Sequence, residues 1–396
     1  MFCSMNYEHI LSSKVKQLKP SGIRRFFDIA NEMEGVISLG VGEPDFDTPY
    51  SVRQAGIRSL EQGRTFYTAN TGLADLRGGI ANYLDRRFHL KYDAKDEIIV
   101  TVGGSEAIDI AVRALVNPGD EVIIPEPSFV CYVPIVELCG GVPVTISTKM
   151  ENEFRLTAQE LKDHITDKTK LGILPFPNNP TGAVLERENL EEIADVIRGT
   201  DIMILSDEIY SELNYGKERH VSIAEIDGMW ERTLLVNGFS KSYAMTGWRM
   251  GYLCGPAPVM AQIKKIHQFA IMCAPTVSQY AALEAINNCD ANIAEMREEY
   301  DIRRRFLVNE LNKMGLTCFE PKGAFYAFPN ITSTGLTSEE FCTRLLYSKK
   351  IAVVPGDAFG ESGEGHVRIS YSYSIRHLQR ALRAIAEFIQ ELKEEQ

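Results

Sequence analysis

Residues 238–255 read GFSKSYAMTGWRMGYLCG and place one lysine, Lys241, among small and aromatic residues. The run before them, RTLLV, is leucine-rich and β-branched, which is typical of a buried strand. A lysine at the end of such a strand is costly because its ammonium group loses hydration. Desolvation can also make a lysine nucleophilic, and the guanidinium of Arg249 suits a phosphate. A surface loop with scattered cations would not explain Gly247, Trp248 and the apolar residues that follow. The stretch therefore predicts a reactive lysine beside an anion.

Apolar runs alternate with helical patterns on both sides of this stretch. EIIVTV precedes the helical SEAIDIAVRALV, and KLGILPF precedes LERENLEEIADVIR. This alternation predicts an α/β domain over residues 46–290, with a mostly parallel sheet and helices on both of its faces. After it, a long helical pattern, short strand patterns and a closing helix predict a smaller α+β domain over residues 291–396. Residues 1–45 are too short to fold alone, so we expect them to pack on the smaller domain.

Composition excludes several classes of protein. The 396 residues are 44% hydrophobic and 24% charged, and a net charge of −12 with scattered Lys and Arg disfavours nucleic-acid binding. We find no apolar run with the length of a signal peptide or of a membrane span. Eight cysteines, from Cys3 to Cys342, form no CxxC pair and lie at no zinc-binding spacing. We therefore expect free thiols in a reducing cytoplasm, no metal, and no membrane or nucleic-acid partner.

Polar residues follow four of the predicted strands, which is where an open α/β sheet binds ligands. The glycine pair after EIIVTV precedes a helix, whose first N–H groups can bind an anion, although many such turns are only turns. Asp207 ends a buried strand and needs a partner, which could be an arginine, a helix N-terminus or a heterocyclic nitrogen. The residues and motifs that we expect at this edge are Gly103, Gly104, Ser105, PNNPTG, Asp207, Tyr210 and Lys241.

In this order, the motifs resemble the fold-type I pyridoxal-phosphate aminotransferases of class I/II, the aspartate-aminotransferase superfamily. The resemblance spans almost the whole chain, through SLGVGEPDFDTP, YTANTGLADLR, PNNPTG, SDEIY, SKSYAMTGWRMGY and HVRISYS. The pair of SKSYAMTGWR and PNNPTG is highly specific. The resemblance implies a transaminase that moves an amino group from an L-amino acid to a 2-oxo acid. It also implies pyridoxal 5′-phosphate as the cofactor and aspartate or an aromatic amino acid as the donor, with alanine and methionine open.

The resemblance further implies which residues hold the cofactor. Lys241 would bind it as an aldimine and later shuttle the proton, and Asp207 would pair with the pyridinium nitrogen. Tyr210 and Asn179 would hydrogen-bond the phenolic oxygen, and Phe129, in PEPSFVCY, would stack on the ring. The residues implied to bind the phosphate are Gly104, Ser105, Ser240 and Arg249.

Three other residues are implied to complete the site. Arg368, in HVRIS, would bind the α-carboxylate of the substrate, with help from Gly42 and Asn179. Tyr67, in FYTANTG, would reach the phosphate site of a neighbouring subunit. The resemblance therefore implies a homodimer with shared active sites.

The chain departs from many relatives at two positions, and other functions stay open. Gly238 stands where relatives carry a serine, and Phe129 stands where they often carry a tyrosine or tryptophan, so cofactor binding could be looser. Because fold does not fix the reaction, a cysteine-type β-lyase is an alternative. A distant alternative is an α/β serine hydrolase, with GGSEA as a relaxed nucleophile elbow and Ser105 followed by His366 in hydrolase order. A non-catalytic sensor domain is disfavoured because we find no added DNA-binding segment.

Overall fold

The computed structural model describes residues 7–18 and 33–395 and is organised around one large sheet. The sheet has seven strands in the order β2-β8-β7-β6-β5-β3-β4. Every neighbouring pair is parallel except the two pairs that β8 makes, with β2 and with β7. The predicted α/β class with a mostly parallel sheet is therefore confirmed. The strands are β2 Ile98–Val102, β3 Glu121–Glu126, β4 Val142–Ser147, β5 Thr169–Leu174, β6 Met203–Asp207, β7 Thr233–Gly238 and β8 Met250–Cys254.

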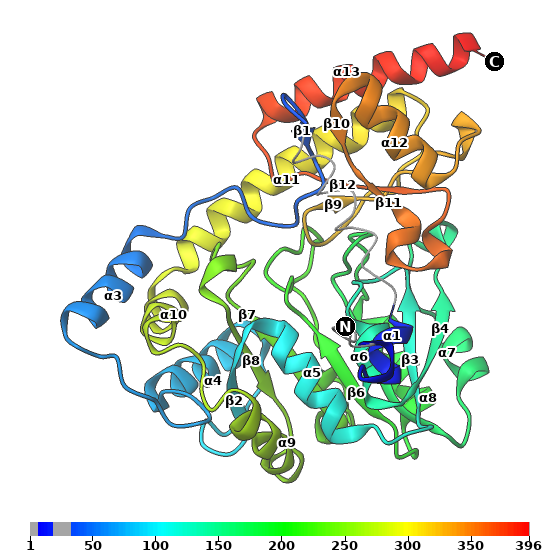
Figure 1. Ribbon diagram of the computed structural model, residues 1–396. Helices are drawn as coiled ribbons and strands as arrows, with labels where there is room; N and C mark the ends of the chain where they lie inside the picture. The colour runs from blue at the N-terminus through cyan, green and yellow to red at the C-terminus, as the bar shows by residue number, and fades with distance from the viewer. Residues whose placement is uncertain (1–6, 19–32, 396) are drawn as a thin grey trace, which may run out of the picture.

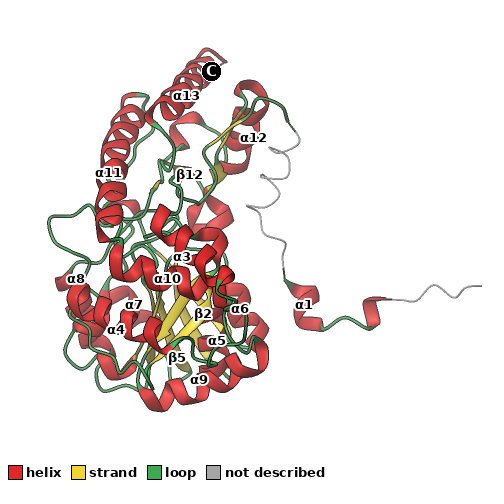
Figure 2. Cartoon of the chain, turned by 90° about the vertical axis from the view of Figure 1, so that its left-hand side faces the viewer, coloured by secondary structure: helices red, strands yellow, loops and turns green. Residues whose placement is uncertain are grey.

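Helices cover both faces of this sheet, as Figures 1 and 2 show. Successive residues of a central strand face opposite sides, so Ile98 and Val100 join one apolar core and Ile99 joins another. Strands buried on both faces become continuous apolar runs, which is why EIIVTV and RTLLV lack a polar alternation. The helices that pack around the sheet are α3 Tyr50–Glu61, α4 Ala74–Phe88, α5 Gly103–Leu115, α6 Tyr132–Cys139, α7 Ala158–His164, α8 Arg187–Ile197, α9 Ala257–Ala270 and α10 Thr276–Asn288.

The C-terminal part of the chain forms a second unit, seen above the large sheet in Figure 1. Its helices pack on a three-stranded antiparallel sheet of order β11-β12-β9. The last helix buries one apolar stripe at the spacing of a single helix face, through Leu378, Leu382, Ile385 and Ile389. The elements of this C-terminal unit are α11 Asp290–Lys313, β9 Tyr326–Ala327, α12 Ser338–Lys349, β10 Ile351–Ala352, β11 Val354–Pro355, β12 Val367–Ser370 and α13 Ile375–Glu395.

The described N-terminal residues make contacts in two places. Strand β1 (Ile37–Ser38) pairs in parallel with β10 and so joins the C-terminal unit. Helix α1 (Ser13–Gln17) lies instead beside α6, where Lys14 Nζ donates to the carbonyl oxygen of Leu138 at 3.0 Å. Residues 1–6 and 19–32 of the predicted N-terminal segment lie outside the described residues.

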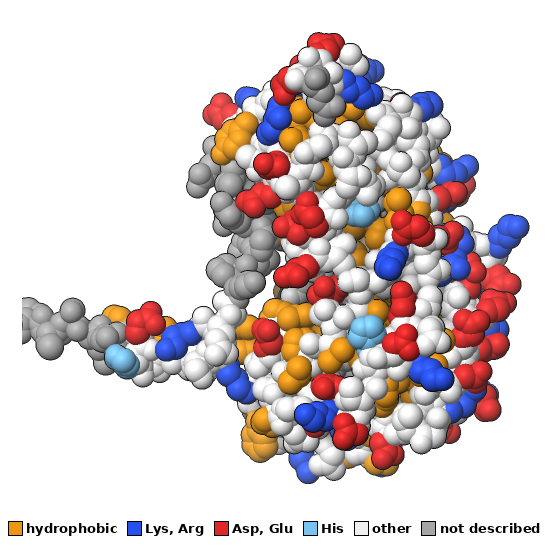
Figure 3. Space-filling view, turned by 90° about the vertical axis from the view of Figure 1, so that its right-hand side faces the viewer, with side chains coloured by type: hydrophobic (Ala, Val, Ile, Leu, Met, Phe, Trp, Pro, Cys, Tyr) orange, Lys and Arg blue, Asp and Glu red, His pale blue; other side chains and the backbone are white. Residues whose placement is uncertain are grey.

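The surface carries charges of both signs. Figure 3 shows Asp and Glu side chains spread among Lys and Arg on one face of the molecule. In the described ranges 7–18 and 33–395, we find no helix with the length and apolar character that crossing a membrane would require. The seven cysteines of the described ranges are free thiols, and Cys3 lies outside those ranges.

Candidate active site

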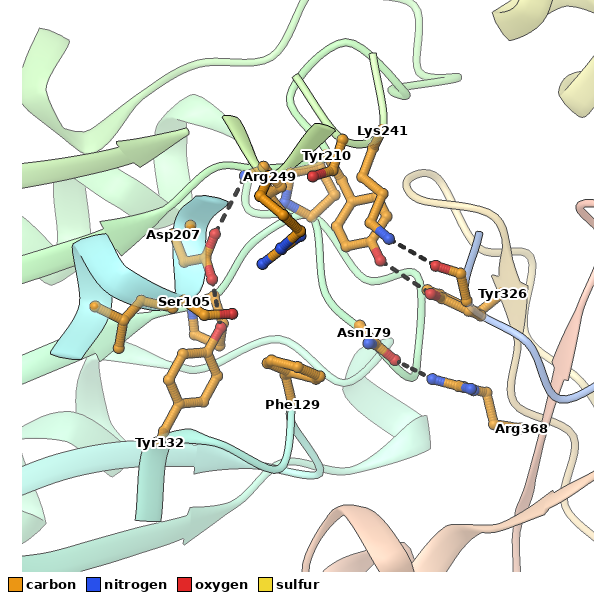
Figure 4. A pocket seen from close by; sticks show the side chains of 17 residues that line it. Ser105, Phe129, Tyr132, Asn179, Asp207, Tyr210, Lys241, Arg249, Tyr326 and Arg368 are labelled. Atoms are coloured by element: carbon orange, nitrogen blue, oxygen red, sulfur yellow. Dashed lines mark hydrogen bonds between the residues drawn. The ribbon is translucent and has the colours of Figure 1, made fainter. Parts of the chain in front are cut away.

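A cavity of about 270 Å³ lies at the carboxyl ends of the strands and brings most of the predicted residues together (Figure 4). Strand β2 runs in the same direction as β7, because both are antiparallel to β8, so the ends of β2, β5, β6 and β7 reach the same edge. Tyr67 does not line this cavity, and the residue is 81% exposed. The predicted residues that line it are Gly42, Gly104, Ser105, Phe129, Asn179, Asp207, Tyr210, Ser240, Lys241, Arg249 and Arg368.

Lys241 follows the end of β7 and points into this cavity. Its Nζ donates to the carbonyl oxygen of Gly42 at 2.6 Å. The pKa of Lys241 is lowered to about 8, mainly by burial; Glu43 opposes this shift, and the guanidinium groups of Arg368 and Arg249 add to it. A lysine with this pKa is partly neutral near pH 7, and only the neutral amine is a nucleophile. Burial in the cavity therefore favours the nucleophilic form of Lys241.

Asp207 is the last residue of β6 and is buried. The hydroxyl of Tyr132 donates to its Oδ2 at 2.7 Å, and the N–H of Ile209 donates to its Oδ1 at 3.2 Å. Burial raises the pKa of Asp207 to about 6, although these hydrogen bonds oppose the rise. The Tyr132 hydroxyl and the Ile209 N–H are neutral groups and do not compensate the negative charge of the carboxylate. The ionised Asp207 could therefore pair with a cation in the cavity.

Groups that suit an anion gather at the start of α5. Gly103 has a φ of +72°, and a Cβ there would lie 2.6 Å from Nη2 of Arg249, so a glycine lets the guanidinium reach the helix start. Ser105 and Ser240 line the same side of the cavity. Free N–H groups at a helix N-terminus, hydroxyls and a guanidinium together suit a phosphate.

Close packing of two strands explains why a glycine stands at position 238. A Cβ at this position would lie 2.9 Å from the carbonyl oxygen of Met250 and 3.0 Å from Cα of Gly251, on the neighbouring strand β8. The close approach of β7 and β8 therefore accommodates a side chain at this position only if the backbone shifts.

Arg368 enters the cavity from β12 of the C-terminal unit and is buried. Its Nη1 donates to Oδ1 of Asn179 at 2.8 Å, and its Nη2 donates to the carbonyl oxygen of Gly40 at 2.5 Å. Its Nε is buried and has no hydrogen-bond partner within the part of the chain that the structure describes. Burial lowers the pKa of Arg368. A buried guanidinium with an unused donor suits a carboxylate ligand.

Two tyrosines that contribute to the cavity were missed by sequence reasoning. Tyr132 follows Phe129 by three residues and donates to Asp207; its ring meets that of Phe129 edge-on, with centroids 6.2 Å apart. A buried tyrosine needs a hydrogen-bond partner, so the carboxylate could have been proposed as that partner. Tyr326 contacts Tyr210 and Arg368, and its short apolar strand holds no signal that would have revealed this.

The hydrolase alternative lacks its histidine. His366 does not line the cavity. Its ring stacks on Phe328, with centroids 5.0 Å apart, and its Nε2 lies 3.3 Å from Nδ2 of Asn330. His366 therefore does not lie where it could act as the general base of Ser105.

The fold and the cavity define a cofactor-dependent α/β enzyme, and comparisons with known proteins identify its family. The family model "Aminotransferase class I and II" matches residues 34–385. An aspartate aminotransferase of Pyrococcus abyssi is 46% identical, and the alignment covers 97% of this chain and 99% of that protein. An aromatic-amino-acid aminotransferase of Thermococcus litoralis is 44% identical with the same coverages. The crystal structure of an aromatic aminotransferase from Pyrococcus horikoshii matches with a TM-score of 0.89 at 45% identity, covering 93% of this chain and 99% of that one.

The chain belongs to the class I and II aminotransferases. It is a pyridoxal-phosphate-dependent transaminase, so the predicted family, reaction class and cofactor are confirmed. The cavity fits this cofactor by its own chemistry. It offers an amine for the aldehyde, a buried carboxylate for the ring nitrogen, a helix start with a guanidinium for the phosphate, and the flat ring of Phe129.

Proposed function

We propose that Lys241 binds pyridoxal phosphate covalently and carries the proton during transamination. The observation that supports this most is the placement of its Nζ in one cavity with Asp207 and Arg249, with a pKa lowered to about 8. The bound cofactor supplies an electron sink for the charge that develops on the substrate's α-carbon. Lys241 Nζ, once released, is the base that takes the proton from that carbon and returns it.

We propose that the other lining residues bind the ring and the phosphate of the cofactor. Asp207 pairs with the ring nitrogen, and Tyr210 donates to the phenolic oxygen. Asn179 uses its Oδ1 to accept from Arg368, which leaves its Nδ2 to donate to the same oxygen. Phe129 covers one face of the ring. The phosphate ligands in this proposal are Gly104, Ser105, Ser240 and Arg249.

Arg368 is proposed to bind the substrate α-carboxylate. We expect Arg368→Lys to raise the amino-acid KM by at least about tenfold, because an ammonium cannot match two carboxylate oxygens as a planar guanidinium does. The absorbance of the bound cofactor should stay nearly unchanged. Steady-state kinetics and a visible spectrum measure the two effects. A KM within about twofold of the wild-type value would contradict this role.

The donor is proposed to be aspartate or an aromatic amino acid. Both kinds of relative cover nearly the whole chain at similar identity, so similarity alone does not choose between them. Single-turnover spectra against a panel of amino acids, followed by addition of 2-oxoglutarate, would identify the donor and show whether the nitrogen stays on the enzyme. Continuous release of ammonia and pyruvate from cysteine, without any 2-oxo acid, would indicate the β-lyase reaction instead.

We propose that the protein is a homodimer with shared active sites. Tyr67 lies on a loop with other exposed apolar residues. Hydrogen bonds tie this loop to the start of α10, from Thr276 Oγ1 to the carbonyl oxygen of Phe66 at 2.7 Å, and to the α9–α10 connection, from Asn70 Nδ2 to the carbonyl oxygen of Met272 at 2.8 Å. Exposed apolar residues of this kind are typical of a subunit interface. Those that we propose to lie in this interface are Tyr50, Ile57, Leu60, Phe66, Tyr67, Phe269, Ile271 and Met272.

Mixed dimers test the shared site. Tyr67→Ala chains and Lys241→Ala chains should each have low activity, whereas hybrids of the two should regain part of it, because one of their two sites has both residues intact. Subunit exchange is followed by native mass spectrometry, and the activity of the mixture is assayed. Hybrids that form but regain no activity would contradict the proposal.

A cytoplasmic location is proposed from the free thiols, since a reducing compartment keeps cysteines unpaired. Cell fractionation with an antibody against the chain would test it, and recovery outside the soluble cytoplasmic fraction would contradict it.

A further inference from the structure

Tyr326 lies where the two parts of the active site meet (Figure 4). It is the first residue of β9 in the C-terminal unit, and it is buried. Its hydroxyl oxygen is 2.9 Å from that of Tyr210, which follows β6 of the large sheet. The guanidinium carbon of Arg368 lies over its ring, 4.5 Å from the centroid. One side chain therefore contacts the residue assigned to the cofactor's phenolic oxygen and the residue assigned to the substrate carboxylate.

The neighbouring backbone maintains this position. Tyr326 pairs with Ser370 in the β9–β12 ladder, so the same small sheet carries both its ring and Arg368. A Cβ on Gly42 would lie 2.5 Å from the hydroxyl oxygen of Tyr326, so only a glycine leaves room for that hydroxyl. The side chain is thus held on both sides, by β12 and by the segment that accepts from Lys241.

The number of protons on the two hydroxyls sets the direction of their hydrogen bond. Burial raises the pKa of Tyr210 and of Tyr326, so both stay protonated near neutral pH. A tyrosine hydroxyl has one proton to donate. When Tyr210 donates to the cofactor's phenolic oxygen, it can only accept from Tyr326. A hydroxyl that accepts a hydrogen bond is polarised and donates more strongly itself.

We propose that Tyr326 is a positioning residue of the transaminase: its hydroxyl strengthens the hydrogen bond from Tyr210 to the cofactor, and its ring holds the guanidinium of Arg368 in place for the substrate carboxylate. This inference rests on the proposed function, because it uses the roles assigned there to Tyr210 and Arg368. A cation over an aromatic face is attracted to it, and the attraction grows when the pair is buried.

Three variants separate the hydroxyl, the ring and general destabilisation. Tyr326→Phe keeps the ring and removes the hydroxyl, and Tyr326→Leu removes both. The matched control is Tyr371→Phe, because Tyr371 is buried in the same core and its hydroxyl donates to the backbone oxygen of Ala324 at 3.1 Å, away from the cavity lining. Thermal unfolding of all three variants shows whether each is folded at the assay temperature.

The first measurement is the pH titration of the visible absorption band of the bound cofactor. A weaker donor at the phenolic oxygen leaves the cofactor holding its proton to higher pH, so we expect Tyr326→Phe to raise the midpoint by at least about 0.5 pH unit. The second measurement is the Kd of 2-oxoglutarate, which carries an α-carboxylate but no amino group, by calorimetry. We expect a change below about twofold for Tyr326→Phe and a loss of about fivefold or more for Tyr326→Leu.

A midpoint for Tyr326→Phe within about 0.2 pH unit of the wild type would overturn the role of the hydroxyl, as would an equal shift in Tyr371→Phe. Equal Kd values for the Phe and Leu variants would overturn the role of the ring. A failure of the proposed function looks different, because wild-type protein would then show no titrating band that borohydride fixes to Lys241.

Discussion

Lys241→Ala should lower kcat by at least about ten-thousandfold, the upper end of what a positioned acid–base group contributes. The variant loses both the amine that bonds to the cofactor and the base that moves the proton on the substrate's α-carbon. The phosphate and ring contacts are unaffected, so the variant should still bind pyridoxal phosphate, without a covalent link. Borohydride reduction followed by peptide mapping should label Lys241 in the wild type and no lysine in the variant.

The control for this prediction is Lys265→Ala, because Lys265 is exposed on α9, outside the cavity, and its Nζ donates to Oε1 of Gln262 at 2.6 Å. The Lys265→Ala variant should keep wild-type activity.

The pKa of Lys241 allows a second test, in which pH is varied. The amine is neutral above its pKa, so the rate at which cofactor-free protein captures pyridoxal phosphate should rise with pH and level off above about 8. A borohydride label on another lysine of the wild-type protein would contradict the assignment of Lys241 as the cofactor-binding lysine.

Asp207→Asn should lower kcat by about a thousandfold, which corresponds to about 4 kcal/mol, the range for breaking a buried ion pair. The amide keeps the shape of the side chain and can accept from Tyr132, but it carries no charge to hold the ring nitrogen protonated. Without that proton the cofactor is a poorer electron sink. Single-turnover kinetics with a saturating donor would measure the loss directly. Activity above about one tenth of wild type would contradict the pairing.

Tyr132→Phe is the matched control for Asp207, since it removes a neutral donor to the same carboxylate. This variant should lower kcat by about tenfold, as expected for one hydrogen bond to a charged group.

The pKa of Asp207 in the cofactor-free protein predicts how cofactor affinity depends on pH. Below about pH 6 the carboxyl becomes neutral and cannot pair with a cation, so wild-type affinity for the cofactor should fall as pH drops through that value. The fall should be absent in Asp207→Asn.

Local sequence was informative where a charged residue stands at or just after the end of a buried strand. Lys241 and Asp207 each stand out because a charged group follows a run of buried apolar residues, and burial of an unpaired charge calls for an explanation. Parallel strands end at the same edge of a sheet, so the two residues could be expected to meet from the sequence alone. The glycine pair before α5 gave a weaker signal, because many tight turns share it.

Only the tertiary structure revealed strand β8 and the partners of Tyr132 and Tyr326. The antiparallel strand β8 was not predicted as a strand, since MGYLC is too short to reveal which partners it chooses. Tyr132 contacts a carboxylate 75 positions away in the chain, and Tyr326 contacts a hydroxyl 116 positions away. Such partners depend on how the two units pack together, which no sequence window contains.

By itself, the sequence determined the α/β class, the family and most residues of the cavity, because those depend on apolar periodicity and on short motifs at strand ends. Only the tertiary structure decided the pKa values of these groups and the contacts that they make. Burial sets the pKa values of Lys241 and Asp207, and the approach of β7 to β8 favours glycine at position 238. The meeting of the two units places Tyr326 between Tyr210 and Arg368. Desolvation and close packing arise only when distant segments come together, and that is why these properties could not be predicted from local sequence.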